Sequence, residues 1–286
     1  MTDRLAVSLA PIDTEQCLEQ LRALAPKIGL AEICLDMMDS FDLPLIISQS
    51  PCPLIITCRP VREGGAFQGT EQERLAILEC AIDAGCAYID VEWDSVALLR
   101  RRHHRRTQII VSRHWHECVP FSILNELYME LKQKAEVVKF AYPARSVTEI
   151  IPILLFMHRA TSYVIGIAMN LPGRLTRLLA PCFPNSLLTY VAAAQGMATA
   201  EGQFCLDEAI EQYHLERLGL HTRVYLHLCE NEAEEQMVIE RNKGVMPGET
   251  VHFPLRATRA EWSKLKPIFK ACCPRLTLVT GDAIKR

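Results

Sequence analysis

The sequence predicts an α/β protein built on a (β/α)8 TIM barrel, with a small α/β extension at its C-terminal end. Eight short strand-type runs alternate with helical patterns between residues 4 and 218, which is the number and order of elements in such a barrel. Most of these runs are continuously apolar, as parallel strands covered on both faces should be. Polar residues gather where the runs end, and active sites of this fold lie at the C-terminal ends of the strands.

The predicted elements alternate along the chain in a regular order. The eight strands cover residues 5–9, 32–35, 54–58, 88–92, 108–111, 137–141, 163–169 and 187–192. Helical patterns cover residues 14–24, 70–84, 121–134, 146–158 and 204–218, with N-caps expected at Thr14, Thr70 and Ser146. A doubly wound open sheet is the structural alternative, but no GxGxxG motif follows the first strand.

Residues 219–286 are predicted to form a separate region. Strand-type segments lie at 222–228 and 250–255, an acidic stretch at 230–235, a helical pattern at 259–273 and a last strand at 276–280. Such a β-β-α-β unit makes a marginal core by itself. We therefore expect a barrel over residues 1–218 and an extension over 219–286 that docks on it, pairs with another chain or stays partly mobile.

Composition excludes several classes of function. The chain has 286 residues, of which 49% are hydrophobic and 23% charged, with a formal net charge of -3. We therefore expect no nucleic acid and no membrane as partner, and interpret the basic run 100–106 as a solvated loop. No signal-peptide pattern opens the chain, and the twelve cysteines include no CxxC pair. We expect free thiols, no metal site and a cytoplasmic location, and leave a homodimer open.

One strand carries a residue that points to chemistry. Lys139 is a lone cation inside an apolar strand, and His114 closes the strand before it. Burial disfavours the charged form of a lysine, and the neutral amine attacks carbonyl groups. A histidine nearby supplies an acid and base. The pair therefore predicts Schiff-base catalysis, whereas the alternative for the lysine alone is an ammonium that reaches solvent.

Seven short motifs stand in order along residues 4–218. They are Glu32 to Asp36, Arg59 with Glu63-Gly64-Gly65, Asp90 to Glu92, Ser112 to His114 with Pro120, Lys139 to Ala141, Met169 to Arg177, and Thr199 to Gln203. In this order they resemble the patterns ExRxD, R with EGG, DxE, SxH with a later proline, KxA, Mx3Gx2[ST]R and SAPGQ of the type I 3-dehydroquinate dehydratases.

The resemblance implies a hydro-lyase that converts 3-dehydroquinate to 3-dehydroshikimate and water, in the shikimate pathway of aromatic amino acid and chorismate biosynthesis. Lys139 would form the Schiff base, His114 would act as acid and base, and Glu63 would orient His114. No metal or organic cofactor is implied. The substrate would be bound by Ser8, Glu32, Arg59, Met169, Arg177, Thr199 and Gln203.

Two positions depart from the family pattern. Cys34 stands where the family has an arginine, and Glu201 stands where it has a proline. We expect weaker substrate binding with the chemistry intact. The alternatives are a catalytically impaired pseudoenzyme of the same fold, or another Schiff-base barrel such as an aldolase.

The extension carries a fainter resemblance. Residues 222–225 and 253–257 resemble the junction and the start of a fused shikimate dehydrogenase, as found in bifunctional enzymes. The glycine-rich segment and the catalytic lysine motif of that enzyme are eroded, so we expect no dehydrogenase activity. An unrelated α/β extension is the alternative.

Overall fold

Eight parallel strands form the barrel in the computed structural model, which describes residues 4–100, 107–273 and 275–280. The strand order is β7-β6-β5-β4-β3-β2-β1-β8. The ring closes where Val164 donates to the carbonyl of Asn185 at 2.8 Å and accepts from the amide of Leu187 at 2.9 Å. The strands are β1 Leu5–Leu9, β2 Leu30–Cys34, β3 Leu54–Thr57, β4 Tyr88–Glu92, β5 Gln108–His114, β6 Val137–Pro143, β7 Tyr163–Met169 and β8 Thr189–Ala192.

Each strand divides its side chains between two buried regions, because successive residues point to opposite faces. In β6, Val137 and Ala141 belong to a cluster that fills the interior of the barrel, whereas Val138, Phe140 and Tyr142 pack in the layer between strands and helices. Both faces are apolar, which explains the continuous hydrophobic runs. Lys139 alternates with Val138 and Phe140, so it faces the barrel interior.

Seven helices accompany the strands within the described part of residues 4–218. They are α1 Thr14–Leu24, α2 Leu43–Gln49, α3 Glu71–Asp83, α4 Phe121–Leu131, α5 Ile151–Arg159, α6 Asn170–Leu179 and α7 Leu206–Glu211. The sequence patterns predicted neither α2, which is short, nor α6, which begins directly after β7 and contains Pro172 and Gly173.

The predicted helix starts and ends differ from the structure at three places. The capping box of Thr70 and Glu73 is confirmed, but α1 is capped by Asp13 instead of Thr14. Ser146 makes no cap, because the first turn after it is a 3-10 turn that leads into α5. The predicted helix 204–218 is interrupted after α7, where His214 has a φ of 49°.

The extension is a three-stranded parallel sheet with two helices. Its elements are β9 Arg223–Cys229, α8 Glu232–Glu240, β10 Thr250–Arg256, α9 Arg259–Cys272 and β11 Leu276–Val279, with strand order β10-β9-β11. The predicted β-β-α-β pattern was wrong, because the acidic stretch begins helix α8. Asn231 caps that helix, and acidic residues near a helix N-terminus favour the helix dipole.

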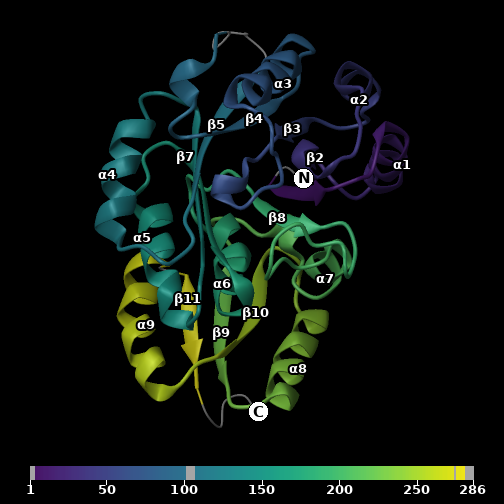
Figure 1. The fold of residues 1–286 in the computed structure, drawn as a ribbon. Coiled ribbons are helices and arrows are strands. Elements are labelled where there is room, and N and C mark those ends of the chain that lie inside the picture. The colour runs from purple at the N-terminus through teal and green to yellow at the C-terminus, as the bar shows by residue number, and fades with distance from the viewer. Residues whose placement is uncertain (1–3, 101–106, 274, 281–286) are drawn as a thin grey trace.

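The extension packs against the side of the barrel that is formed by helix α5 and by the segment after helix α7. In Figure 1 it lies below the barrel, with α9 beside α5. The ring of Tyr213, which follows α7, meets the ring of Phe253 in β10 edge to face, with centroids 5.5 Å apart. The inner face of the small sheet thus joins the same hydrophobic layer as the barrel helices.

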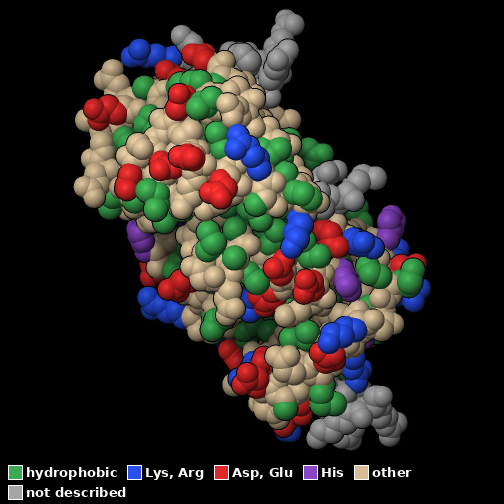
Figure 2. All heavy atoms as spheres, turned by 90° about the vertical axis from the view of Figure 1, so that its right-hand side faces the viewer, with side chains coloured by type: hydrophobic (Ala, Val, Ile, Leu, Met, Phe, Trp, Pro, Cys, Tyr) green, Lys and Arg blue, Asp and Glu red, His purple; other side chains and the backbone are tan. Residues whose placement is uncertain are grey.

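The surface mixes charges of both signs. Figure 2 shows acidic and basic side chains interspersed over one face of the molecule. Most of the predicted basic loop, residues 101–106, lies outside the described residues. All twelve cysteines are free thiols. Among the described residues, no helix is long and apolar enough to cross a membrane.

Candidate active site

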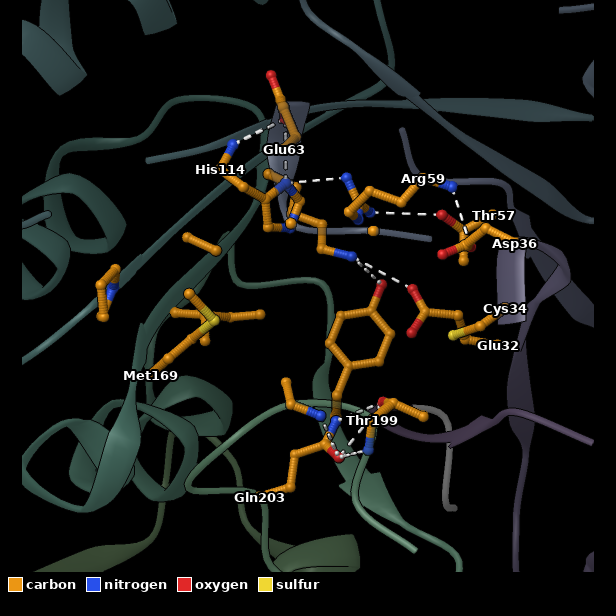
Figure 3. Close-up of a pocket in the computed structure, with 18 of the residues that line it drawn as sticks. Glu32, Cys34, Asp36, Thr57, Arg59, Glu63, His114, Met169, Thr199 and Gln203 are labelled. Atoms are coloured by element: carbon orange, nitrogen blue, oxygen red, sulfur yellow. Dashed lines mark hydrogen bonds and ion pairs between the residues drawn. The ribbon is translucent and has the colours of Figure 1, made fainter. Parts of the chain in front are cut away.

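A cavity of about 440 Å³ opens at the C-terminal ends of the barrel strands. In Figure 3, Glu32, Cys34 and Asp36 stand on one side of it and Met169 on the opposite side. The cavity is lined by nine of the ten residues predicted for the site, namely Glu32, Arg59, Glu63, His114, Lys139, Met169, Arg177, Thr199 and Gln203. The fold therefore brings together side chains from β2, β3, β5, β6 and β7 and from the segments that follow the strands.

Lys139 is only 4% exposed and lies at the floor of the cavity. Its Nζ is 2.7 Å from Oδ2 of Asp90 and 3.2 Å from Oε1 of Glu32. The hydroxyl group of Tyr190 is 3.3 Å away. The three N–H bonds of the ammonium group thus each have an acceptor, and two of these acceptors are carboxylates.

His114 ends β5 above Lys139. Its backbone N–H donates to Oε2 of Glu63 at 3.0 Å, and its Nδ1 lies 3.3 Å from the same oxygen. Burial lowers the pKa of His114 well below its ordinary value, and the positive charges of Arg59 and Lys139 lower it further. The imidazole is therefore neutral near pH 7 and able to accept a proton.

Asp36 fixes the loop that carries Glu63. Its Oδ1 accepts from the backbone N–H of Arg59 at 2.9 Å, and its Oδ2 accepts from that of Ala66 at 3.0 Å. Gly65 passes so close to the Arg59 carbonyl oxygen that a Cβ would stand 2.1 Å from it. The glycine in the Glu63-Gly64-Gly65 motif thus permits a turn that places Glu63 beside His114.

Arg59 connects the carboxylates of β4 with the histidine. Its guanidinium lies 3.1 Å from Asp90 and 3.2 Å from Glu92, and Nη1 is 2.9 Å from Nδ1 of His114. Glu92 also forms an ion pair with Arg74, a completely buried side chain from α3. This buried network holds Arg59 at the cavity wall, since breaking one member would leave a charge without a partner.

Arg177 is a buried cation with few partners. It is 2% exposed, its Nη1 reaches the carbonyl oxygen of Tyr190 at 3.5 Å, and its Nε has no hydrogen-bond partner among the described residues. Burial lowers the pKa of Arg177 to about 10, and the charge of Arg174 adds to this effect. A buried guanidinium that lacks an anion suits a carboxylate ligand, which it can bind through two N–H bonds.

The loop after β8 forms the opposite wall. The side chain of Gln203 accepts from the backbone N–H of Thr199 at 3.0 Å and donates to the Thr199 hydroxyl at 3.3 Å. Gly202 has a φ of 78°, and a Cβ there would stand 2.4 Å from the carbonyl oxygen of Asn170. Glu201 is exposed and does not line the cavity, so its carboxylate adds no charge to the cavity wall.

Ser8 is placed differently from the other predicted residues. It is 1% exposed and does not line the cavity. Its hydroxyl group donates to Oε2 of Glu32 at 2.8 Å. Ser8 thus orients a carboxylate of the site, and a direct contact with a ligand stays a prediction.

Two residues of the site were missed from the sequence. Tyr190 was hidden in the eighth apolar run, where an aromatic residue is ordinary in a strand. Arg74 lies in a helix four residues after its N-cap, and only the tertiary structure brings it to Glu92. Asp90 was noted as a strand-end carboxylate but was given no role, although its position opposite Ile110 in register, on the interior face, places it beside Lys139.

Comparison with known proteins decides the family. The model of a family described as Type I 3-dehydroquinase matches residues 5–219. The chain belongs to the type I 3-dehydroquinase family. The predicted family resemblance and the predicted barrel are confirmed, and the strand-end residues described above therefore lie within the region that defines this family.

Two curated relatives are each about a third identical in sequence to this dehydroquinase-family chain. A 3-dehydroquinate dehydratase of Methanocaldococcus jannaschii is 31% identical over 195 residues, which cover 65% of this chain and 86% of the relative. The bifunctional 3-dehydroquinate dehydratase/shikimate dehydrogenase of Arabidopsis thaliana is 31% identical over 206 residues, which cover 68% of this chain. The match spans about a third of the Arabidopsis protein, 34% of its length.

Solved structures of this family resemble the chain in fold. The 3-dehydroquinate dehydratase of Geobacillus kaustophilus has a TM-score of 0.64 at 21% identity and covers 73% of this chain and 89% of its own. The dehydroquinate dehydratase and shikimate dehydrogenase structure from S. pombe has a TM-score of 0.60 at 17% identity. That likeness covers 98% of this chain and 57% of the S. pombe chain, so it includes the C-terminal extension.

Proposed function

We propose that this protein is a 3-dehydroquinate dehydratase, a hydro-lyase that forms 3-dehydroshikimate and water through a Schiff base on Lys139. One observation carries the proposal. An amine nucleophile, a neutral histidine and a buried arginine with no anionic partner among the described residues line one cavity, namely Lys139, His114 and Arg177. Family membership and relatives that bear this name support the same activity.

The covalent step begins with the amine of Lys139. Attack on the ring ketone requires the neutral amine, so Lys139 first passes a proton to a neighbouring group, and the carboxylate of Asp90 lies 2.7 Å away. The C–N bond forms, the ketone oxygen leaves as water, and a protonated imine remains. The imine draws electrons from the adjacent carbon, which makes a proton on that carbon easier to remove.

The elimination step uses His114. Its neutral imidazole takes the proton from the carbon next to the imine, and the electron pair moves toward the imine nitrogen. The hydroxyl group beyond that carbon then departs with the proton that His114 returns, which releases water. Glu63 supports this cycle, because a carboxylate at Nδ1 orients the ring and stabilises it while it is charged. Hydrolysis of the product imine restores Lys139.

Substrate recognition is assigned to the two walls of the cavity. Arg177 would bind the substrate carboxylate, and Gln203 and Thr199 would add hydrogen bonds beside it. Arg59 and Glu32 would contact the ring hydroxyl groups, with Ser8 orienting Glu32. Met169 would pack against the ring, since its side chain lines the cavity. The substrate is a small molecule, and this chemistry requires no metal or organic cofactor.

We also propose that the chain divides into a barrel of residues 1–218 and an extension of residues 219–286. The family model ends at residue 219, and the strands on either side of that point belong to different sheets. The likeness to the bifunctional S. pombe structure supports a remnant of shikimate dehydrogenase in the extension. We also propose a cytoplasmic location and no nucleic acid as partner.

Borohydride reduction in the presence of 3-dehydroquinate tests the activity. The imine would be reduced to a stable amine, and mass spectrometry of peptides would find the adduct on Lys139. A parallel absorbance assay would follow the conjugated product. Folded protein that yields neither adduct nor product at saturating substrate would overturn the proposal, whereas an adduct without product would indicate an impaired enzyme.

A further inference from the structure

Tyr190 stands next to the nucleophile and has no role in the chemistry described so far. It lies in β8, is 2% exposed and lines the cavity. Its hydroxyl oxygen is 3.3 Å from Nζ of Lys139, and the ring centroid is 4.4 Å from the same nitrogen. The Tyr190 hydroxyl is thus the third hydrogen-bond partner of the ammonium group, beside two carboxylates. A buried hydroxyl group that contacts the nucleophile in a reaction cavity is a candidate for function.

The polarity of these contacts is determined by the partners. An ammonium group only donates and a carboxylate only accepts. The Tyr190 hydroxyl therefore accepts a hydrogen bond from Lys139. Glu32 accepts a second one, with its Oε1 at 3.2 Å from Nζ.

We propose that Tyr190 is a positioning residue, which sets the direction from which the amine of Lys139 attacks. The inference rests on the proposed function. Nζ is surrounded by Asp90, Glu32 and Tyr190, and the proposed step passes one proton to Asp90. The two N–H bonds that remain are then held by Glu32 and by the Tyr190 hydroxyl. These two contacts fix where the lone pair of the amine points, so Tyr190 helps to set the direction of attack.

The same wall of the cavity holds the proposed carboxylate site. Nη1 of Arg177 reaches the backbone carbonyl oxygen of Tyr190 at 3.5 Å. A substrate carboxylate bound by Arg177 would therefore lie against the strand that carries Tyr190. Tyr190 thus contacts both the nucleophile and the residue proposed to bind the substrate, and a fixed orientation of the amine toward the ring carbonyl lowers the barrier to attack.

Replacement of the hydroxyl group alone tests the proposal. Tyr190→Phe keeps the aromatic ring. Lys139 still has its two carboxylate acceptors, Asp90 and Glu32, so the fold is expected to persist. Imine formation would be followed in single turnovers by rapid borohydride quench. We expect it to slow about 2- to 10-fold, the factor that one buried hydrogen bond carries, while the dissociation constant of the non-covalent substrate complex stays unchanged.

Tyr142→Phe is the matched control. Tyr142 is fully buried in β6 but faces the helix layer, where its hydroxyl donates to the carbonyl oxygen of Glu149 at 2.7 Å. This variant should form the imine at the wild-type rate. Should Tyr190→Phe not fold, 3,5-difluorotyrosine at position 190 replaces it, since its oxygen is a poorer acceptor in a ring of similar shape, and the same slowing is expected.

The outcomes separate the two proposals. Imine formation at the wild-type rate in a folded Tyr190 variant would overturn the positioning role. A weaker non-covalent complex with an unchanged rate would also overturn it, because Tyr190 would then bind substrate only. Wild-type protein that forms no imine would instead contradict the proposed function itself.

Discussion

Nη1 of Arg59 and Nδ1 of His114 lie 2.9 Å apart, while Oε2 of Glu63 lies 3.3 Å from the same imidazole nitrogen. One nitrogen cannot accept from the guanidinium and donate to the carboxylate at the same time. Pairing with Arg59 places the proton of neutral His114 on Nε2, whereas pairing with Glu63 leaves Nε2 free to act as the base. The two contacts are therefore alternatives, and the second is the arrangement that proton removal requires.

Glu63→Gln should lower kcat by about 10- to 100-fold with a much smaller change in KM, because an amide does not stabilise the charged imidazole as a carboxylate does. Steady-state kinetics of the dehydration measures both constants. Glu126→Gln, a change of the same kind at an exposed position of α4, is the control. A Glu63→Gln enzyme with unchanged kcat would remove Glu63 from the proposed mechanism.

Lys139→Ala should abolish turnover and the borohydride adduct together. It should also lower the free energy of unfolding by about 3–5 kcal/mol, because Asp90 and Glu32 lose a buried cation, although Asp90 keeps Arg59. Product formation and urea unfolding provide the two readouts, with the exposed Lys134→Ala as the control. Turnover near the wild-type value would contradict the assignment of the nucleophile.

Cys34→Arg should lower KM by about 10- to 150-fold, the effect of one charge-assisted hydrogen bond. Cys34 lines the cavity between the carboxylates of Glu32 and Asp36, so an arginine there gains anionic neighbours and faces the substrate. Cys34→Ser removes the thiol without adding charge and should leave KM unchanged. An arginine variant that folds and shows no fall in KM would refute weakened binding at this position.

Stability of the extension should fall in mild acid. His227 is 1% exposed, and its Nε2 lies 2.8 Å from Nδ1 of His252. Burial lowers the pKa of His227 to about 4, and nearby His252 and Arg241 contribute. An unfolded histidine titrates near pH ~6.5, so between about pH 6.5 and 4 the unfolded chain binds more protons than the folded one. The contribution of neutral, buried His227 to the free energy of unfolding is therefore fully present above this pH window and is lost as the pH falls through it.

Urea unfolding at several pH values between 7 and 4 measures this loss. His227→Gln should reduce the pH dependence by nearly one proton, whereas His158→Gln, at an exposed position of α5, should leave it unchanged. Equal pH dependence in wild type and His227→Gln would show that the buried histidine pair does not control acid stability.

Much of the site was predictable because its residues follow a rule of the fold. Strand ends of a parallel barrel meet at one edge, so Glu32, Arg59, His114 and Lys139 come together once the strands are recognised. Tyr190, Arg74 and the recessed position of Ser8 were not predictable in the same way. Their roles depend on contacts between side chains from different strands and helices, and the spacing of residues along the chain does not predict such contacts.

The extension illustrates the same limit. Its strands were predicted from apolar runs. Helix α8 was missed because it is rich in acidic residues and has one buried side chain, Val238, so its sequence shows no periodic apolar face. Helix formation there depends on the Asn231 cap and on packing over the small sheet, which are consequences of tertiary structure.

The sequence by itself determined the barrel, the polar residues at its strand ends and the family, because the alternation of apolar runs and the short motifs are local properties of the chain. Only the tertiary structure decided what surrounds each reactive group. It placed three acceptors around Lys139, put Arg59 and Glu63 at the same nitrogen of His114, and turned Glu201 away from the cavity. These features arise because side chains distant in sequence pack close together in the fold. Inside the protein, charges and hydrogen bonds interact more strongly than they do in water.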